Sequence, residues 1–212
     1  MENKNVEYEI KAWAPSEKKL SEMLIGFRRD SEIIKQIDKY YDTDERLLYK
    51  KGVFLRNRNN IVLEIKYNSN VNENAHFDCE ETTFQLPLDE KSFNNLRLFL
   101  NQFFRTNEKI SSLEFIDSVL KELHLENFVT IDKERETYRK EGVEFCIDSV
   151  LGLGNFIEIE CTEQETSKQY ITWTTKEGVK PIPVGYVELY LRKFDFDTYL
   201  TGRYLLEEDR PK

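Results

Sequence analysis

The sequence contains little glycine and proline, 8 and 5 of its 212 residues. This scarcity excludes a collagen-like chain and a chain dominated by flexible linkers. No apolar run approaches the ~18 residues that a membrane helix needs. The first residues, MENKNVEYEIK, have no apolar stretch behind a basic start, so we expect no signal peptide. The three cysteines, Cys79, Cys146 and Cys161, lack metal or redox spacing, which indicates reduced thiols in a cytoplasmic protein.

Positive charge is also in deficit, because the formal net charge is −9. A protein that coats nucleic acid needs a basic face, so we expect neither an extended nucleic-acid surface nor a membrane partner. Aromatic residues are plentiful, with 14 Phe and 11 Tyr, and they can fill a hydrophobic core. The length of 212 residues favours one large domain, with or without a helical appendage.

Apolar periodicity divides the chain into strands and helices. We expect eight strands, at about residues 6–13, 33–42, 53–58, 61–67, 76–86, 128–139, 143–150 and 155–161. We expect helical segments at about residues 16–27, 89–104, 112–123, 167–174 and 186–200. The pair Asn59-Asn60 can take the left-handed angles of a tight hairpin. The pattern predicts an α+β fold built on an antiparallel barrel or a strongly curled sheet, with helices outside.

Charged residues alternate with apolar ones along five of these strands. The charges that stand two residues apart on one face are Glu7, Glu9 and Lys11; Arg56 and Arg58; Glu64 and Lys66; Lys133 and Arg135; Glu158 and Glu160. For any single strand, the solvent-facing side of a sheet would explain the pattern. Five such strands together favour a sheet closed with its charged face inward and its apolar outside covered by the amphipathic helices.

A lumen with both acids and bases suits one kind of chemistry. Mg²⁺ and Mn²⁺ prefer oxygen ligands and bridge carboxylates to phosphates, whereas Arg and Lys neutralise phosphate oxygens. Acids alone would suggest a cation store, and bases alone would suggest an anion clamp. Both together indicate metal-assisted phosphoryl or nucleotidyl chemistry.

A series of motifs, in order from residue 6 to about residue 160, resembles the CYTH domain, also called the triphosphate tunnel metalloenzyme superfamily. The first, VEYEIK at residues 6–11, resembles the ExExK signature of that family. The others are Tyr40-Tyr41-Asp42-Thr43, Leu55-Arg56-Asn57-Arg58, Leu63-Glu64-Ile65-Lys66, Cys79-Glu80-Glu81, Lys133-Glu134-Arg135, Ile147-Asp148-Ser149-Val150 and LGNFIEIE at residues 153–160. The segment 185–189 fits the terminal helix of the family.

The resemblance implies an eight-stranded antiparallel tunnel that binds a triphosphate and one or two divalent cations, Mg²⁺ or Mn²⁺. It implies a single domain over residues 1–212, with a helical insertion at about residues 89–124 and a helical C-terminal segment at about residues 163–212. Exposed helices outside the barrel would permit a homodimer.

The resemblance also implies a site. The implied metal ligands are Glu7, Glu9, Asp148, Glu158 and Glu160. The implied phosphate-binding residues are Lys11, Arg56, Arg58, Lys66, Lys133 and Arg135. The candidate catalytic residues are Lys11, Lys66, Glu81 and Tyr40. On the fifth strand only one of Glu80 and Glu81 can face inward, and we favour Glu81. Tyr40 or Tyr41 could donate a hydrogen bond or a proton, although aromatic residues on strands usually belong to the core.

Three functions compete. The first is metal-dependent hydrolysis of the terminal phosphate of tripolyphosphate, a nucleoside triphosphate or thiamine triphosphate. The second is a class IV adenylyl cyclase, because LGLGNFIEIE at residues 151–160 resembles cyclase-like members. The third is a catalytically silent triphosphate-binding module, which the retention of every charged motif position disfavours. Gly185-Tyr186 stands where some thiamine triphosphatases carry a lysine, which weakens the case for thiamine triphosphate.

Overall fold

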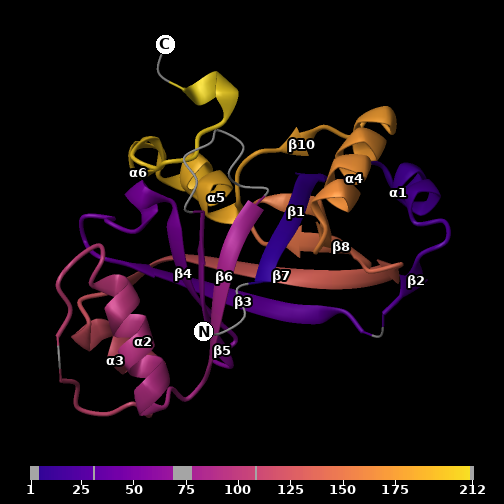
Figure 1. Ribbon diagram of the computed structural model, residues 1–212. Helices are drawn as coiled ribbons and strands as arrows, with labels where there is room; N and C mark the ends of the chain where they lie inside the picture. Colours follow the sequence, from indigo (N-terminus) through magenta and orange to yellow (C-terminus); the bar gives the residue numbers. More distant parts are fainter. Residues whose placement is uncertain (1–4, 31, 69–77, 108, 211–212) are drawn as a thin grey trace.

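The computed structural model of the protein describes residues 5–30, 32–68, 78–107 and 109–210, and all of their side chains except those of residues 5–7, 78 and 79. Figure 1 shows a strongly curved sheet with helices packed around it. The predicted mixed α+β fold with a large antiparallel sheet is therefore confirmed.

The elements follow the expected order along the chain. The strands are β1 (Asn5–Trp13), β2 (Arg28–Arg29), β3 (Ile34–Asp42), β4 (Val53–Arg58), β5 (Val62–Tyr67), β6 (Asp78–Gln85), β7 (Glu126–Lys140), β8 (Val143–Val150), β9 (Gly154–Cys161) and β10 (Pro181–Ile182). The α-helices are α1 (Glu17–Met23), α2 (Glu90–Leu100), α3 (Ile116–Glu122), α4 (Gln164–Lys176), α5 (Tyr186–Phe194) and α6 (Phe196–Leu200). The 3₁₀ helices are η1 (Tyr49–Lys51) and η2 (Glu207–Asp209).

The sheet has ten strands in the order β10-β1-β6-β5-β4-β3-β7-β8-β9, with β2 paired to β7. The prediction of eight strands is therefore wrong in number. The two extra strands, β2 and β10, have two residues each, which is too short for an alternating pattern to reveal them. Strand β1 has neighbours on both sides, since residues 5–8 pair with β6 and residues 8–13 pair with β9.

The hairpin between β4 and β5 shows why this part of the chain folds locally. Asn59 and Asn60 have φ angles of 54° and 56°, the left-handed conformation that asparagine tolerates better than most residues. The side chain of Asn57 accepts a hydrogen bond from the Asn60 backbone N–H at 3.1 Å. The turn sets the register that places Arg56 opposite Glu64.

Helices α2 and α3 cover the outer face of β4, β5 and β6 (Figure 1). Asp89 caps α2, because its side chain accepts a hydrogen bond from the Ser92 N–H at 2.7 Å. Leu96 and Leu120 from the two helices pack with Leu63 in one hydrophobic cluster, and all three side chains are fully buried. The apolar face of these strands thus turns away from the charged face and toward the helices.

Two further clusters cover the rest of the sheet. Helices α5 and α6 pack with residues of β3, β7, β8 and β9, with Tyr199 and Phe156 fully buried there. Helices α1 and α4 cover β1, β8 and β9 around Ile159. None of the helices in the described part of the chain combines the length and apolar character that a membrane crossing requires.

Candidate active site

The charged faces of the strands line a cavity of about 290 Å³. The cationic side chains on its wall are Lys11, Arg56, Arg58, Lys66, Lys133 and Arg135. The acidic side chains on its wall are Glu9, Glu64, Glu81, Glu158, Glu160 and Glu188. These residues are far apart in the sequence, since 179 positions separate Glu9 from Glu188. The acidic and the cationic side chains that line the cavity are equal in number.

Strand alternation explains how these side chains converge. On β4, Arg56 and Arg58 line the cavity, whereas Leu55, which precedes Arg56, is 1% exposed in the opposite core. On β9, Glu158 and Glu160 line the cavity, whereas Ile159 is buried on the opposite face. Successive side chains on a strand point to opposite sides, so the charged set and the apolar set of these two strands separate onto opposite faces.

Glu158 lies at the centre of a buried ion-pair cluster. Its carboxylate contacts Lys11 and Arg135 closely, and Lys133 Nζ lies 3.9 Å away. Burial acts to raise the pKa of Glu158, but the cations around it outweigh burial and hold the pKa well below its usual value. Glu158 is therefore ionised at neutral pH despite being 3% exposed.

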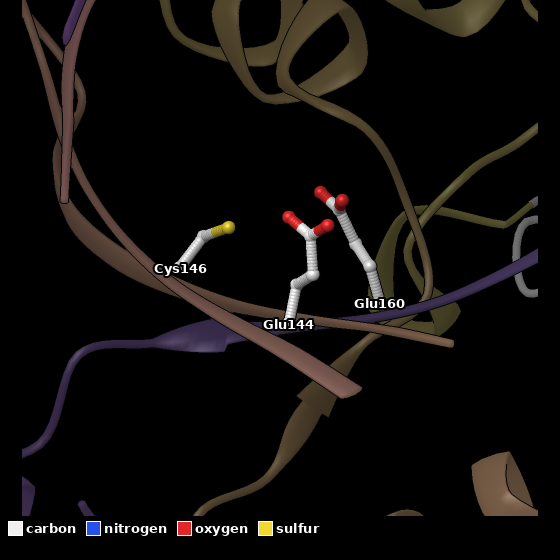
Figure 2. A group of neighbouring side chains, drawn as sticks. All are labelled: Glu144, Cys146 and Glu160. Atoms are coloured by element: carbon white, nitrogen blue, oxygen red, sulfur yellow. The ribbon is translucent and has the colours of Figure 1, made fainter. Parts of the chain in front are cut away.

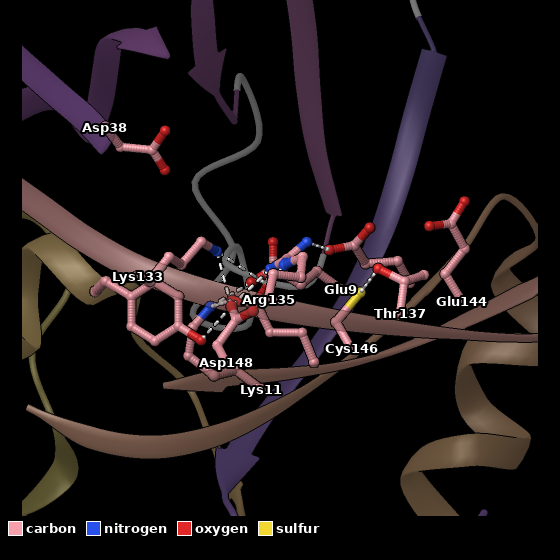
Figure 3. Close-up of polar contacts among 12 residues, drawn as sticks. Glu9, Lys11, Asp38, Lys133, Arg135, Thr137, Glu144, Cys146 and Asp148 are labelled. Atoms are coloured by element: carbon pink, nitrogen blue, oxygen red, sulfur yellow. Dashed lines mark hydrogen bonds and ion pairs between the residues drawn. The ribbon is translucent and has the colours of Figure 1, made fainter. Parts of the chain in front are cut away.

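Asp148 lies behind the cavity wall and holds the cations in place. It is fully buried and accepts hydrogen bonds from Lys133 at 2.7 Å, Arg135 at 2.7 Å and the Tyr186 hydroxyl at 2.9 Å. Figure 3 shows Lys11, Lys133 and Arg135 gathered near Asp148, with Asp38 set apart. The Tyr186 ring also lies 4.2 Å from Lys11 Nζ and 4.9 Å from Lys133 Nζ, close enough for cation–π attraction.

Glu9 forms a second group of contacts with two lysines. Lys66 Nζ lies 2.7 Å from its carboxylate, and Lys11 bridges Glu9 to Glu158. Burial and the Glu158 carboxylate act to raise the pKa of Glu9, but Lys11 and Lys66 outweigh both and lower the pKa to about 2. Lys11 is correspondingly held charged, because its pKa is raised above the usual value by Glu158 and Glu9 in spite of burial.

The two arginines of β4 share Asp38 on the neighbouring strand β3. Asp38 is 1% exposed and accepts from Arg58 at 2.7 Å and from Arg56 at 3.4 Å. Burial acts to raise the pKa of Asp38, but the two guanidinium groups lower it to about 2. Arg56 also contacts Glu64 at 2.8 Å. The planar fork of each arginine is thus oriented toward the cavity by fixed carboxylates.

In each of two pairs of neighbouring residues, Tyr40 with Tyr41 and Glu80 with Glu81, one side chain lines the cavity and the other lies elsewhere. Tyr40 lines the cavity, whereas the Tyr41 hydroxyl donates to Asp117 of α3 at 2.6 Å on the other face. Glu81 lines the cavity, whereas Glu80 accepts from the Tyr67 hydroxyl at 2.9 Å.

The two inward-facing groups, Tyr40 and Glu81, both have raised pKa values. Burial raises the pKa of Tyr40 to about 12. Burial and the neighbouring Glu64 raise the pKa of Glu81, although Arg56 and Lys66 act against them. Tyr40 therefore keeps its proton at neutral pH, and Glu81 binds a proton more readily than a free glutamate does.

Carboxylates suited to a divalent cation lie at the same wall. Glu9, Glu158 and Glu160 offer the oxygen ligands that Mg²⁺ and Mn²⁺ prefer. Glu160 also forms a group with Glu144 and Cys146, whose ligand atoms lie within 4.8 Å of one another and could hold a metal ion (Figure 2). Burial raises the pKa of the Cys146 thiol to about 12, so the oxygen ligands fit a hard cation better than the sulfur does.

Most of the side chains predicted from the sequence therefore line one cavity, although their individual functions stay predictions. Two predicted residues, Asp148 and Glu7, are not among the described side chains that line the cavity. Asp148 lies behind the wall, and the side chain of Glu7 lies outside the described residues.

The sequence placed Glu64 with Lys66 on the inward face but gave it no function, and it missed Asp38 and Tyr186 as site residues. Asp38 has the parity of Tyr40 on β3, and the same alternation could have identified it. Tyr186 begins helix α5, and no periodic signal marks it.

Solved structures share this fold at low sequence identity. A protein from Pyrococcus horikoshii OT3 is 24% identical, with a TM-score of 0.58, over 88% of this chain and 99% of that one. A proposed adenylate cyclase from Vibrio parahaemolyticus is 16% identical, with a TM-score of 0.57, over 89% and 99%. A proposed adenylyl cyclase from Hippeastrum with a dominant triphosphatase activity is 19% identical, with a TM-score of 0.52, over 98% and 100%.

The fold and the charged cavity define a class of proteins, the CYTH domain. The CYTH domain family matches residues 5–178, which include every strand from β1 to β9. The chain therefore belongs to the CYTH family, and the resemblance of its motifs is confirmed. No curated protein matches the chain in sequence comparison.

Proposed function

We propose that this protein is a divalent-metal-dependent enzyme that hydrolyses the terminal phosphate of a triphosphate. The observation that carries the proposal is one cavity lined by six cationic side chains and six glutamates. A polyanion with several charges is the ligand that can contact so many Lys and Arg side chains at once. The Hippeastrum structure, with its dominant triphosphatase activity, supports hydrolysis as the reaction.

We infer that the sheet surrounds this ligand as a tunnel. Strand β1 pairs with β6 through its first residues and with β9 through its last, which supports an arrangement of strands around the cavity. Such an enclosure removes water from around the phosphates, and the electrostatic attraction of Lys and Arg is then stronger than in bulk solvent.

Each group on the wall has a proposed part in the reaction. A water oxygen attacks the terminal phosphorus in line with the bridging oxygen, the bond to that oxygen breaks, and orthophosphate leaves. The Glu81 carboxylate accepts the proton of the water, because its raised pKa makes it a stronger base than Glu9 or Glu158. The Tyr40 hydroxyl donates a hydrogen bond to a phosphate oxygen, and Lys11 and Lys66 neutralise its charge.

The metal would be held by the carboxylates of the same wall. Glu9, Glu158 and Glu160, with Glu7 as a further predicted ligand, would bind Mg²⁺ or Mn²⁺, which supplies charge neutralisation and orientation of the phosphates. The ion pairs of Glu9 and Glu158 with lysines mean that a metal and a triphosphate must rearrange them together.

A class IV adenylyl cyclase is the second candidate, and the names of the Vibrio parahaemolyticus and Hippeastrum structures favour it. The phosphate contacts would be the same, but the 3′-hydroxyl of ATP would attack the α-phosphorus and diphosphate would leave. The two reactions differ in their products, which makes them separable in one assay.

The test is incubation with ATP, tripolyphosphate or thiamine triphosphate and Mg²⁺ or Mn²⁺, followed by separation of the products. We expect orthophosphate as the first product. Cyclic AMP with diphosphate would instead establish the cyclase, and binding without any product would establish a binding module. Glu9→Gln should abolish turnover, whereas Glu80→Gln, on the opposite face of the sheet, should not.

A further inference from the structure

The Tyr186 side chain contacts two of the lysines that line the cavity. Lys11 Nζ lies over the Tyr186 ring, 4.2 Å from its centroid, and Lys133 Nζ lies 4.9 Å from the same centroid. The attraction between a cation and an aromatic ring is stronger when both are removed from water, and Tyr186 is only 6% exposed. One ring from helix α5 therefore attracts ammonium groups that come from two different strands, β1 and β7.

Two buried side chains fix the position of this ring. The Tyr186 hydroxyl donates to Asp148 Oδ2 at 2.9 Å, and Lys133 Nζ donates to the same oxygen at 2.7 Å. The Phe156 ring packs edge-on against Tyr186, with centroids 5.0 Å apart and planes inclined by 73°. Asp148 and Phe156 are both fully buried, so the ring is held by groups that have no access to solvent.

The backbone around Tyr186 is anchored next to Lys11. Strand β10 pairs with β1 so that Ile182 lies opposite Lys11, and α5 begins shortly after, at Tyr186. The Glu188 carboxylate accepts a hydrogen bond from the Gly185 N–H at 3.1 Å, which stabilises the start of the helix. The C-terminal segment is therefore attached to the sheet at the position where the Tyr186 ring meets the lysine.

The contact of Lys11 with the ring differs in kind from its contacts with carboxylates. Lys11 donates to Glu9 and Glu158, and an ammonium group has only three N–H donors to share among its acceptors. The ring attracts the positive charge of the group electrostatically. A phosphate oxygen can therefore replace a carboxylate at Lys11 while the Tyr186 ring stays in place.

We propose that Tyr186 is a positioning residue that holds the ammonium groups of Lys11 and Lys133 in the cavity, where both contact the phosphate chain. The inference rests on the proposed function, because the two lysines need a bound triphosphate to act on. Without the ring, only carboxylates and the sheet would place these ammonium groups, and a phosphate chain competes with those carboxylates for the same N–H donors.

The experiment measures the Kd of tripolyphosphate without added metal by titration calorimetry, and kcat/KM for tripolyphosphate with Mg²⁺. The variants are Tyr186→Phe, Tyr186→Leu and the control Tyr190→Leu. Tyr190 is a matched control because it lies one turn further along α5 and its ring packs on Phe194, with centroids 4.8 Å apart. Tyr190 is not among the described residues that line the cavity.

A second series tests the ring itself. Phenylalanine with one, two or three fluorine atoms on its ring is incorporated at position 186 and compared with Tyr186→Phe. Fluorine withdraws electron density from the face of the ring and so weakens its attraction for a cation, whereas the ring keeps nearly the same shape. A residue that only fills space would not respond to this series.

We expect Tyr186→Leu to raise Kd and to lower kcat/KM roughly tenfold to hundredfold, because it removes two contacts between a buried ring and a cation. Tyr186→Phe should lose only about threefold, because it keeps the ring and removes one hydrogen bond. Each further fluorine should raise Kd stepwise, and Tyr190→Leu should leave Kd and kcat/KM unchanged.

Two results would overturn the inference while the triphosphatase stands. One is a Kd that does not depend on the number of fluorine atoms, which decides the question even if Tyr186→Leu fails to fold. The other is a Tyr186→Leu variant that folds by circular dichroism and binds tripolyphosphate as tightly as Tyr190→Leu. If the wild type neither binds nor hydrolyses tripolyphosphate, ATP or thiamine triphosphate, the proposed function fails and the inference fails with it.

Discussion

The two faces of strands β4 and β5 differ in what they bury. On the face toward α2 and α3, Leu55, Leu63 and Ile65 are 0–1% exposed and belong to one hydrophobic cluster. On the face toward the cavity, Arg56 and Glu64 form ion pairs. Buried apolar area stabilises a fold directly, whereas buried ion pairs contribute little net stability. The outer face therefore supplies stability, and the inner face supplies chemistry.

The largest expected effect belongs to the outer face. Leu63→Ala should lower the free energy of unfolding by about 3 kcal/mol, because it removes a fully buried side chain and leaves a cavity. Below the unfolding temperature, kcat/KM should stay within about twofold of wild type. Urea unfolding and steady-state kinetics measure the two quantities.

Leu98→Ala is the matched control, since Leu98 of α2 is 63% exposed and a surface change costs within about 0.5 kcal/mol. A large loss of kcat/KM in folded Leu63→Ala would show that the two faces are not separable.

The second effect tests the inner face with its ligand. Tripolyphosphate with Mg²⁺ at a hundredfold excess over Kd should stabilise the protein by about 2.7 kcal/mol and raise Tm. The acids and bases that line the cavity are paired with one another.

Because the cavity is balanced in charge, tripolyphosphate alone or Mg²⁺ alone should raise Tm less than the two together. Circular dichroism should follow the thermal unfolding of the protein by itself, with tripolyphosphate, with Mg²⁺, and with both. An unchanged Tm with saturating triphosphate and metal would argue against a site in this cavity.

The third effect isolates one cation of the cavity wall. Arg58→Ala should remove a charge-assisted contact of ~1.5–3 kcal/mol, or one to two orders of magnitude in kcat/KM. Lys35→Ala is the comparison, because Lys35 is on the neighbouring strand β3 but pairs with Asp132 outside the cavity, and its side chain is 61% exposed. That change should stay within about 0.5 kcal/mol. Equal kinetics in the two variants would contradict phosphate binding by Arg58.

The smallest effect concerns acid stability. The pKa of Asp38 is lowered to about 2 in the folded protein, against about 3.9 in an unfolded chain. Its stabilising contribution, at most about 2.6 kcal/mol, is therefore present above pH 4 and lost as the pH falls toward 2, and only part of it is lost by pH 3.

Urea unfolding at pH 5, 4 and 3 measures this contribution. Stability should fall with pH less steeply in Asp38→Asn than in wild type. If Asp38→Asn kept the full wild-type slope, other carboxyl groups would have to account for the acid sensitivity.

Much of the fold could be predicted because its signals are local. The predicted strand over residues 53–58 coincides with β4, and the hairpin at Asn59-Asn60 is present. The strand expected over residues 76–86 is observed from Asp78 to Gln85, with residues 76 and 77 outside the described residues. The ends of elements shifted by a few residues, because the last turn or pair of an element depends on tertiary neighbours.

The sequence by itself determined which side chains share a face. This follows from the period of two in a strand, so Arg56 with Arg58 and Glu158 with Glu160 needed no tertiary information. Whether Tyr40 or Tyr41, and Glu80 or Glu81, faces the cavity was decided only by strand pairing, because either parity satisfies a single strand.

The tertiary structure alone decided which charges meet. Lys11 contacts Glu158, 147 positions away, and Tyr186 of a C-terminal helix reaches Asp148 across 38 positions. Tyr204 packs on Gly52 from the far end of the chain. No local period encodes such contacts, because each depends on how separately formed strands and helices pack against one another. The sequence thus determined a charged face, and packing made that face a cavity.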